Sequence, residues 1–139
     1  MATMIRPEIS QNNKYWISKH RYYELKHFCL QYPSWKKAIF NIRNSNISSS
    51  VIERIPSGNL PGDPTCNLAI SNIYYSERIN LIEKIAKETD TYLSSYILKA
   101  VTEGLSYVHL KSRLDIPCGR DMYYDKYRRF FWLLSQEKY

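Results

Sequence analysis

The stretch GLSYVHLKSRLDIPCGRDMYYDKYRRFF, residues 104–131, determines how the C-terminal half of the chain is interpreted. One helical pattern ends at Gly104, a short second pattern covers 107–114, and a third begins after Asp115-Ile116-Pro117. A residue before proline avoids helical dihedral angles, so the chain is expected to turn there and to bury Ile116 as an apolar plug. Two helices joined by such a turn form the helix-turn-helix pattern, with residues 90–103 as a supporting helix.

Single residues predict how these helices begin and which face of the last one is buried. Ser106 is expected to cap the helix 107–114, and Cys118 to Asp121 takes the place of a capping box before the last helix. In the last helix, a narrow apolar face repeats at steps of three and four residues, which is typical of core positions. This face consists of Tyr123, Tyr127, Phe130 and Leu134.

If the last helix lies in a major groove, its N-terminal half and outward face must supply the contacts to DNA. Arg120 is then the first candidate for a base edge, with Tyr124 beside it and Arg128 one turn later. The other basic side chains of this region are expected to contact phosphates. The candidate DNA-binding residues are Arg120, Tyr124, Arg128, Arg129, Lys111, Arg113 and Lys126.

Two acidic residues on the same side of the last helix count against this docking. Asp121 and Asp125 repel backbone phosphates unless they are neutralised. Asp125 can pair with Arg128 or Arg129 at i+3 or i+4, and Asp121 can serve as a cap. The turn is also longer than in the tight form of the motif, so a helical corner without any DNA contact stays open as an alternative.

The rest of the chain is predicted to be helical, which makes the fold all-α. Helix-period patterns cover 14–32, a shorter run from Ser34 to Ile42, and a long run that starts at Asp63-Pro64 and reaches about Lys87. The first two are expected to form an antiparallel N-terminal helical pair. The predicted organisation is a helical arm over 1–43, a polar connector over 44–62 and a helix-turn-helix domain over 63–139.

Composition favours a cytoplasmic protein with an anionic partner. The net charge is +7 and the pI is near 9.3, which suits double-stranded DNA, although basic surfaces also occur without such a partner. No apolar run approaches the roughly 18 residues of a membrane span, and no secretory signal pattern opens the chain. The three cysteines are far apart in sequence, so we expect free thiols and no zinc site.

The sequence does not predict an enzyme or a cofactor. His20 and His27 lie on an apolar stripe two turns apart, which favours packed histidines over a metal site. No phosphate-binding glycine loop or hydrolase motif is present. The many tyrosines keep single-strand binding open through base stacking. Trp132 lies opposite the predicted core face, so it either packs on a second side or belongs to a homodimer contact, and a dimer would suit a palindromic site.

Three segments of the chain carry a family resemblance: RYYELKHFCLQYPSWKKAI (21–39), the DPT that opens the long helix (63–65), and residues 96–135 with IPCGRD and YYDKYRRFFWLL. They resemble small phage and prophage transcriptional regulators of the RinA and ArpU type. The resemblance implies a phage-encoded DNA-binding activator of late genes in a bacterial host, with 106–131 as its helix-turn-helix. We expect such a regulator to act as a dimer or through contact with host RNA polymerase.

A second hypothesis comes from another functional class. The helical corner can be a scaffold for protein interaction, as in a phage packaging component or an inhibitor of a host defence nuclease. A DNA-mimicking inhibitor would be acidic, and the charge of +7 counts against that form. Salt dependence separates the two hypotheses, because several phosphate contacts make affinity fall steeply with salt.

Overall fold

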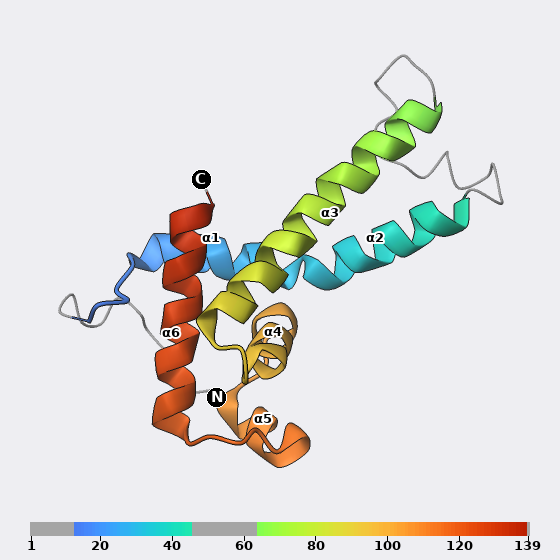
Figure 1. Cartoon of the computed structure of the whole chain (residues 1–139). Helices are drawn as coiled ribbons and strands as arrows, with labels where there is room; N and C mark the ends of the chain where they lie inside the picture. The colour runs from blue at the N-terminus through green and yellow to red at the C-terminus, as the bar shows by residue number, and fades with distance from the viewer. Residues whose placement is uncertain (1–12, 46–63, 139) are drawn as a thin grey trace. The chain divides into compact units, whose positions relative to one another are not determined.

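A computed structural model describes residues 13–45 and 64–138, and these residues form six α-helices without any strand. Their order along the chain is α1 (Lys19–Leu30), α2 (Tyr32–Ser45), α3 (Pro64–Thr89), α4 (Ser94–Glu103), α5 (Tyr107–Leu114) and α6 (Arg120–Glu137) (Figure 1). The prediction of an all-α chain is confirmed for these ranges. None of these helices combines the length and the hydropathy that a transmembrane span requires.

Contacts divide the chain into two compact units. Unit 1 contains α1, α4, α5 and α6 together with α3 from Ile82 onward, and unit 2 covers Tyr32–Leu81. These units do not follow the domains predicted from the sequence, 1–43, 44–62 and 63–139, because α1 packs on α4 and α6. Most of the predicted connector lies outside the described residues.

Unit 1 is built around a core in which three helices meet. Helix α1 contributes Leu25 and Cys29, α4 contributes Ile97, and α6 contributes Phe130 and Phe131, all of them fully buried. The end of α3 adds Ile82 and Ile85, while Leu110 and Ile116 bring α5 and the following turn into the same apolar interior. Burial of this apolar surface is the main stabilising contribution to the unit.

Unit 2 contains α2 and the first part of α3. Trp35 and Ile39 on α2 and Ile79 on α3 are buried. Pro33 occupies the second position of α2, where its missing amide hydrogen has no helical partner to lose. Two N-terminal helices were predicted, but the break lies at Gln31 and not at Pro33, so α2 begins two residues earlier and ends later than expected.

The first helix begins later than its sequence pattern predicts. The amide of Tyr15 donates to the Asn13 side chain, and the amide of Trp16 donates to the Asn13 carbonyl, so this segment is a turn. Ser18 then caps α1 by accepting a hydrogen bond from the amide of Arg21. An apolar period continued through this turn, so periodicity alone did not reveal the start of the helix.

Candidate nucleic-acid interface

The connection between α4 and α5 is short and sharply bent. Gly104 has φ 71°, a left-handed conformation that costs glycine little, and the amide of Leu105 donates to the carbonyl of Ala100 at 3.0 Å. Ser106 caps α5, because its side chain accepts the amide hydrogen of His109 at 3.2 Å. Only residues 104–106 separate the two helices, and both predicted caps are confirmed.

The connection between α5 and α6 is longer and differs from its prediction. Asp115 ends α5 with φ 51°, Ile116 is fully buried as predicted, and the chain continues through residues 117–119. The N-cap of α6 is Gly119, which makes no side-chain capping bond. The capping box expected from Cys118 was therefore wrong: Cys118 lies before the cap, where its amide donates to the carbonyl of Ile116.

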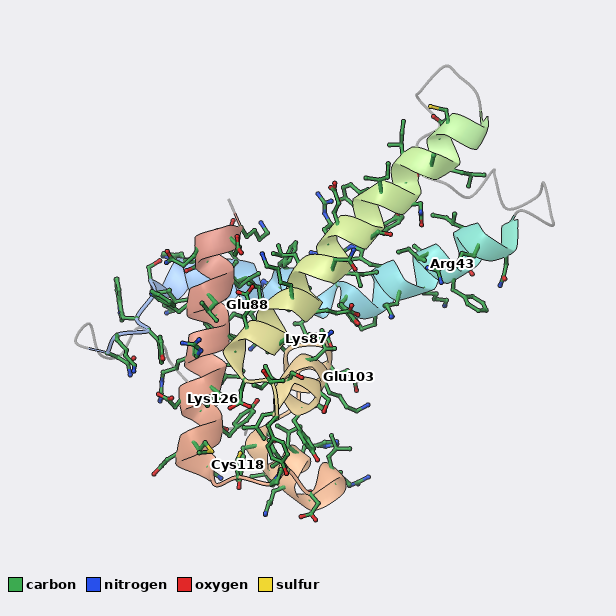
Figure 2. All side chains as sticks on the ribbon, viewed as in Figure 1. Arg43, Lys87, Glu88, Glu103, Cys118 and Lys126 are labelled. Carbon is green, nitrogen blue, oxygen red and sulfur yellow. The ribbon has the colours of Figure 1, made fainter. Side chains whose placement is uncertain are left out.

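Two side-chain contacts hold the start of α5 against the start of α6. The Tyr107 hydroxyl donates to the carbonyl of Cys118 at 2.7 Å. The Arg120 guanidinium lies over the rings of Tyr107 and Tyr124, at 5.5 Å and 5.9 Å from their centroids. Helix α5 and the first turn of α6 therefore meet at one end of unit 1, where Figure 2 labels Cys118 in the connecting turn.

The outer face of α5 carries basic and polar side chains. Leu110 is fully buried and Leu114 is half-buried, so these two residues define the inward face. The helix itself contains no acidic residue, and Asp115 follows it within 4.0 Å of the Lys111 ammonium. The exposed positions of α5 are Val108, His109, Lys111, Ser112 and Arg113.

The first turns of α6 present a different surface. Asp121, Met122 and Asp125 are exposed together with Arg120. Tyr124 is only 8% exposed, and its ring packs against those of Tyr107, Tyr123 and Tyr127. The side of α6 predicted to face a groove thus exposes two carboxylates, while its predicted aromatic contact lies in the core.

A second of the predicted DNA contacts is engaged inside unit 1. The Lys126 ammonium lies 3.4 Å from the Asp90 carboxylate. Burial opposes ionisation of Asp90, but hydrogen bonds from the Leu93 amide, from Lys126 and from the Tyr92 amide outweigh burial. The pKa of Asp90 is therefore lowered. Lys126 is labelled on α6 in Figure 2. Both Lys126 and Tyr124 thereby have roles in folding, and their contacts with DNA stay predictions.

Arg129 joins the end of α3 to the N-terminal segment. Its guanidinium donates to the carbonyls of Thr89 at 3.2 Å and Glu88 at 3.3 Å, and to the Tyr15 hydroxyl at 3.3 Å. The hydrogen bond from Arg129 is the largest cause that lowers the pKa of Tyr15. Because the last carbonyls of a helix lack helical partners, Arg129 supplies hydrogen-bond donors that α3 itself cannot provide at its end.

A comparable contact occurs at the end of α6. Arg21 donates to the carbonyls of Ser135 and Lys138 and also pairs with Glu24 at 2.8 Å. Trp132, whose side was left open by the sequence, packs against the Tyr15 ring with centroids 5.7 Å apart. Of the seven predicted contacts, Lys111, Arg113 and Arg120 lie exposed at the α5–α6 corner, and Arg128 is half-buried further along α6.

A layer of tyrosines fills the space between α1 and α6. The hydroxyls of Tyr22 and Tyr127 lie 2.6 Å apart, while the buried Tyr123 hydroxyl has no hydrogen-bond partner among the described residues. Burial raises the pKa of Tyr123 and of Tyr127, so neither is disposed to ionise at neutral pH. The described residues contain no group of three side chains that could hold a metal ion.

Sequence reasoning did not select three exposed residues of α5, namely Val108, His109 and Ser112. The signal was present, because these positions lie opposite Leu110 and Leu114 at helical spacing. Comparison with family models, curated proteins and solved structures gave no match for this chain.

Proposed function

We propose that the protein binds double-stranded DNA through the corner formed by α5 and the first turn of α6, and that it regulates transcription. The observation that carries the proposal is the outer face of α5, which exposes Lys111 and Arg113 and has no acid on the helix itself; Asp115, just after the helix, lies 4.0 Å from the Lys111 ammonium. Basic side chains of this kind neutralise phosphates and release counterions. The chain's net charge of +7 supports the same class of partner.

Local structure also supports a DNA-binding corner. Helix-turn-helix proteins place a short helix against DNA after a turn of three or four residues that often contains glycine. Here a glycine turn precedes α5, and α4 together with α6 supports the corner from within unit 1. The buried Leu110 in the middle of α5 and the buried Ile116 just after its end anchor the helix on unit 1, so its exposed face is presented on a fixed backbone.

The finer role follows from the sequence resemblance given above. On this proposal the chain acts in the cytoplasm of a bacterial host as a phage or prophage regulator of the RinA and ArpU type. It binds a palindromic site as a homodimer and contacts host RNA polymerase. No catalytic step and no cofactor enter this role.

A comparison of charge-removing variants tests the proposal. Lys111→Gln and Arg113→Gln should each weaken binding to a randomised duplex, and each should reduce the slope of log affinity against log salt by about 0.9 if the lost group contacts one phosphate. The matched control is Lys84→Gln, which removes one exposed positive charge that pairs with Glu137 at the other end of α6.

The outcomes separate DNA binding from the alternatives. If all three substitutions weaken duplex binding equally, the corner contributes only general electrostatic attraction and is not a specific DNA contact. Absence of duplex binding by the wild type would overturn the proposal and favour a protein-interaction module.

A further inference from the structure

We infer that α5, and not α6, is the helix that lies in the major groove, with Val108, His109 and Ser112 reading the bases. The inference rests on the proposed DNA binding and adds the reading helix and its specificity-determining residues. Three residues, 104–106, separate α4 from α5, whereas five residues, 115–119, separate α5 from α6. The first connection matches the short glycine turn of a helix-turn-helix, and the second exceeds it.

The arrangement of side chains around α5 suits a helix placed in a groove. Val108 and Ser112 are four residues apart and His109 is three before Ser112, so the three share the face opposite Leu110. Lys111 and Arg113 flank that face on its two sides. This arrangement suits a helix in the major groove, because uncharged side chains at the centre face the base edges and the cations on both sides face the phosphates of the groove walls.

Each of the central residues has a chemistry that distinguishes base pairs. Val108 is 60% exposed, and its methyl groups can pack on the methyl group of thymine. The His109 ring both donates and accepts hydrogen bonds, and the Ser112 hydroxyl, which donates to the His109 carbonyl at 3.5 Å, can accept one from a base edge. Val108 takes no part in the core of unit 1, so its methyl groups are available for contact with a base.

Electrostatics disfavours the alternative helix. The outward side of the first two turns of α6 carries Asp121 and Asp125 around the exposed Met122, and the charge of Lys126 is already opposed by Asp90. Arg120 alone cannot neutralise two carboxylates that face the phosphates. Arg120 instead lies over Tyr107 in the first turn of α5, where it can contact a phosphate beside the groove that α5 enters.

Selection from a library of randomised duplex DNA by the full chain tests the assignment. The test variants are Val108→Ser and His109→Ala on α5, and the matched variants on α6 are Met122→Ala and Asp125→Asn. All four side chains are exposed, so each variant should fold, and far-UV circular dichroism with thermal melting checks this. We expect each α5 substitution to reduce discrimination at one or two base positions about tenfold and to leave affinity for bulk DNA unchanged.

The outcomes distinguish this inference from the proposed function. The α6 substitutions should leave the selected sequence unchanged. If they change it and the α5 substitutions do not, α6 is the reading helix and the inference is wrong, while DNA binding stands. Salt-dependent binding without any enriched sequence in the wild type also overturns the inference alone. Failure of the wild type to retain any duplex overturns the proposed function itself.

Discussion

Replacement of Arg129 by glutamine distinguishes a structural contact from a DNA contact. Arg129 was predicted to hold a phosphate, but its guanidinium donates to the carbonyls of Glu88 and Thr89 and to the Tyr15 hydroxyl. In unit 1 it therefore joins the C-terminal end of α3 to α6 and to the segment before α1. We expect Arg129→Gln to destabilise the fold.

The magnitude follows from the geometry of these three hydrogen bonds. All of them are long, at 3.2–3.3 Å, so each is expected near the lower end of the usual net contribution of about 0.5 to 1.5 kcal/mol. The attraction of a cation to a helix C-terminus adds about 0.3 to 1 kcal/mol. The free energy of unfolding should fall by about 2 kcal/mol, which lowers the melting temperature of a unit of this size by about 8 to 16 °C.

Urea denaturation followed by tryptophan fluorescence measures the loss. Arg129→Lys keeps the charge but not the planar fork, and it should recover part of the stability. Arg113→Gln is the control, since Arg113 is exposed on α5 and its loss should change stability by less than about 0.5 kcal/mol. Wild-type stability in Arg129→Gln, together with weaker DNA binding, would refute the structural role assigned to this residue.

Four further substitutions probe the tyrosine layer, the α4–α5 turn and the loss of stability at acid pH. Tyr123→Phe should leave the free energy of unfolding unchanged or raise it, since the buried hydroxyl has no partner among the described residues. Tyr127→Phe should lower the free energy of unfolding by about 1 kcal/mol, because it removes a 2.6 Å hydrogen bond to Tyr22. Equal losses of stability in urea denaturation would contradict this difference. Gly104→Ala should cost about 1 to 2 kcal/mol because φ is 71°, and unchanged thermal melting would exclude that strain. The lowered pKa of Asp90 stabilises the fold at neutral pH, and this contribution is lost as the pH falls below about 4. In Asp90→Asn, the free energy of unfolding should therefore fall less steeply at acid pH. An unaltered dependence of stability on pH would show that other carboxyl groups determine the loss.

Several elements of unit 1 were predictable because single residues determine them. Gly104 and Ser106 mark the end of α4 and the start of α5 through the backbone conformation and the hydroxyl that they supply. Ile116 was expected to be buried because it is the one apolar residue in a polar turn before proline. These local rules act over a few residues, so no tertiary knowledge was needed.

Other features depend on tertiary contacts that a pattern does not contain. Arg129 and Lys126 look like free cations in the sequence, and only the fold brings the carbonyls of Glu88 and Thr89, or the carboxylate of Asp90, beside them. Tyr124 fits an exposed position by spacing from Arg120 but packs against Tyr107 across the corner. Six of the seven candidate contacts are basic residues that the sequence shows directly, whereas their exposure to solvent depended on packing.

The most direct test of the account is the salt dependence of duplex binding by the intact chain, measured by fluorescence anisotropy with single-stranded DNA of the same sequence as competitor. Phosphate contacts by Lys111, Arg113 and Arg120 predict that log affinity falls linearly with log salt with a slope of about −3 per protomer, and that the duplex is preferred. A slope near zero, or equal binding of the single strand, would contradict a groove-binding corner at α5.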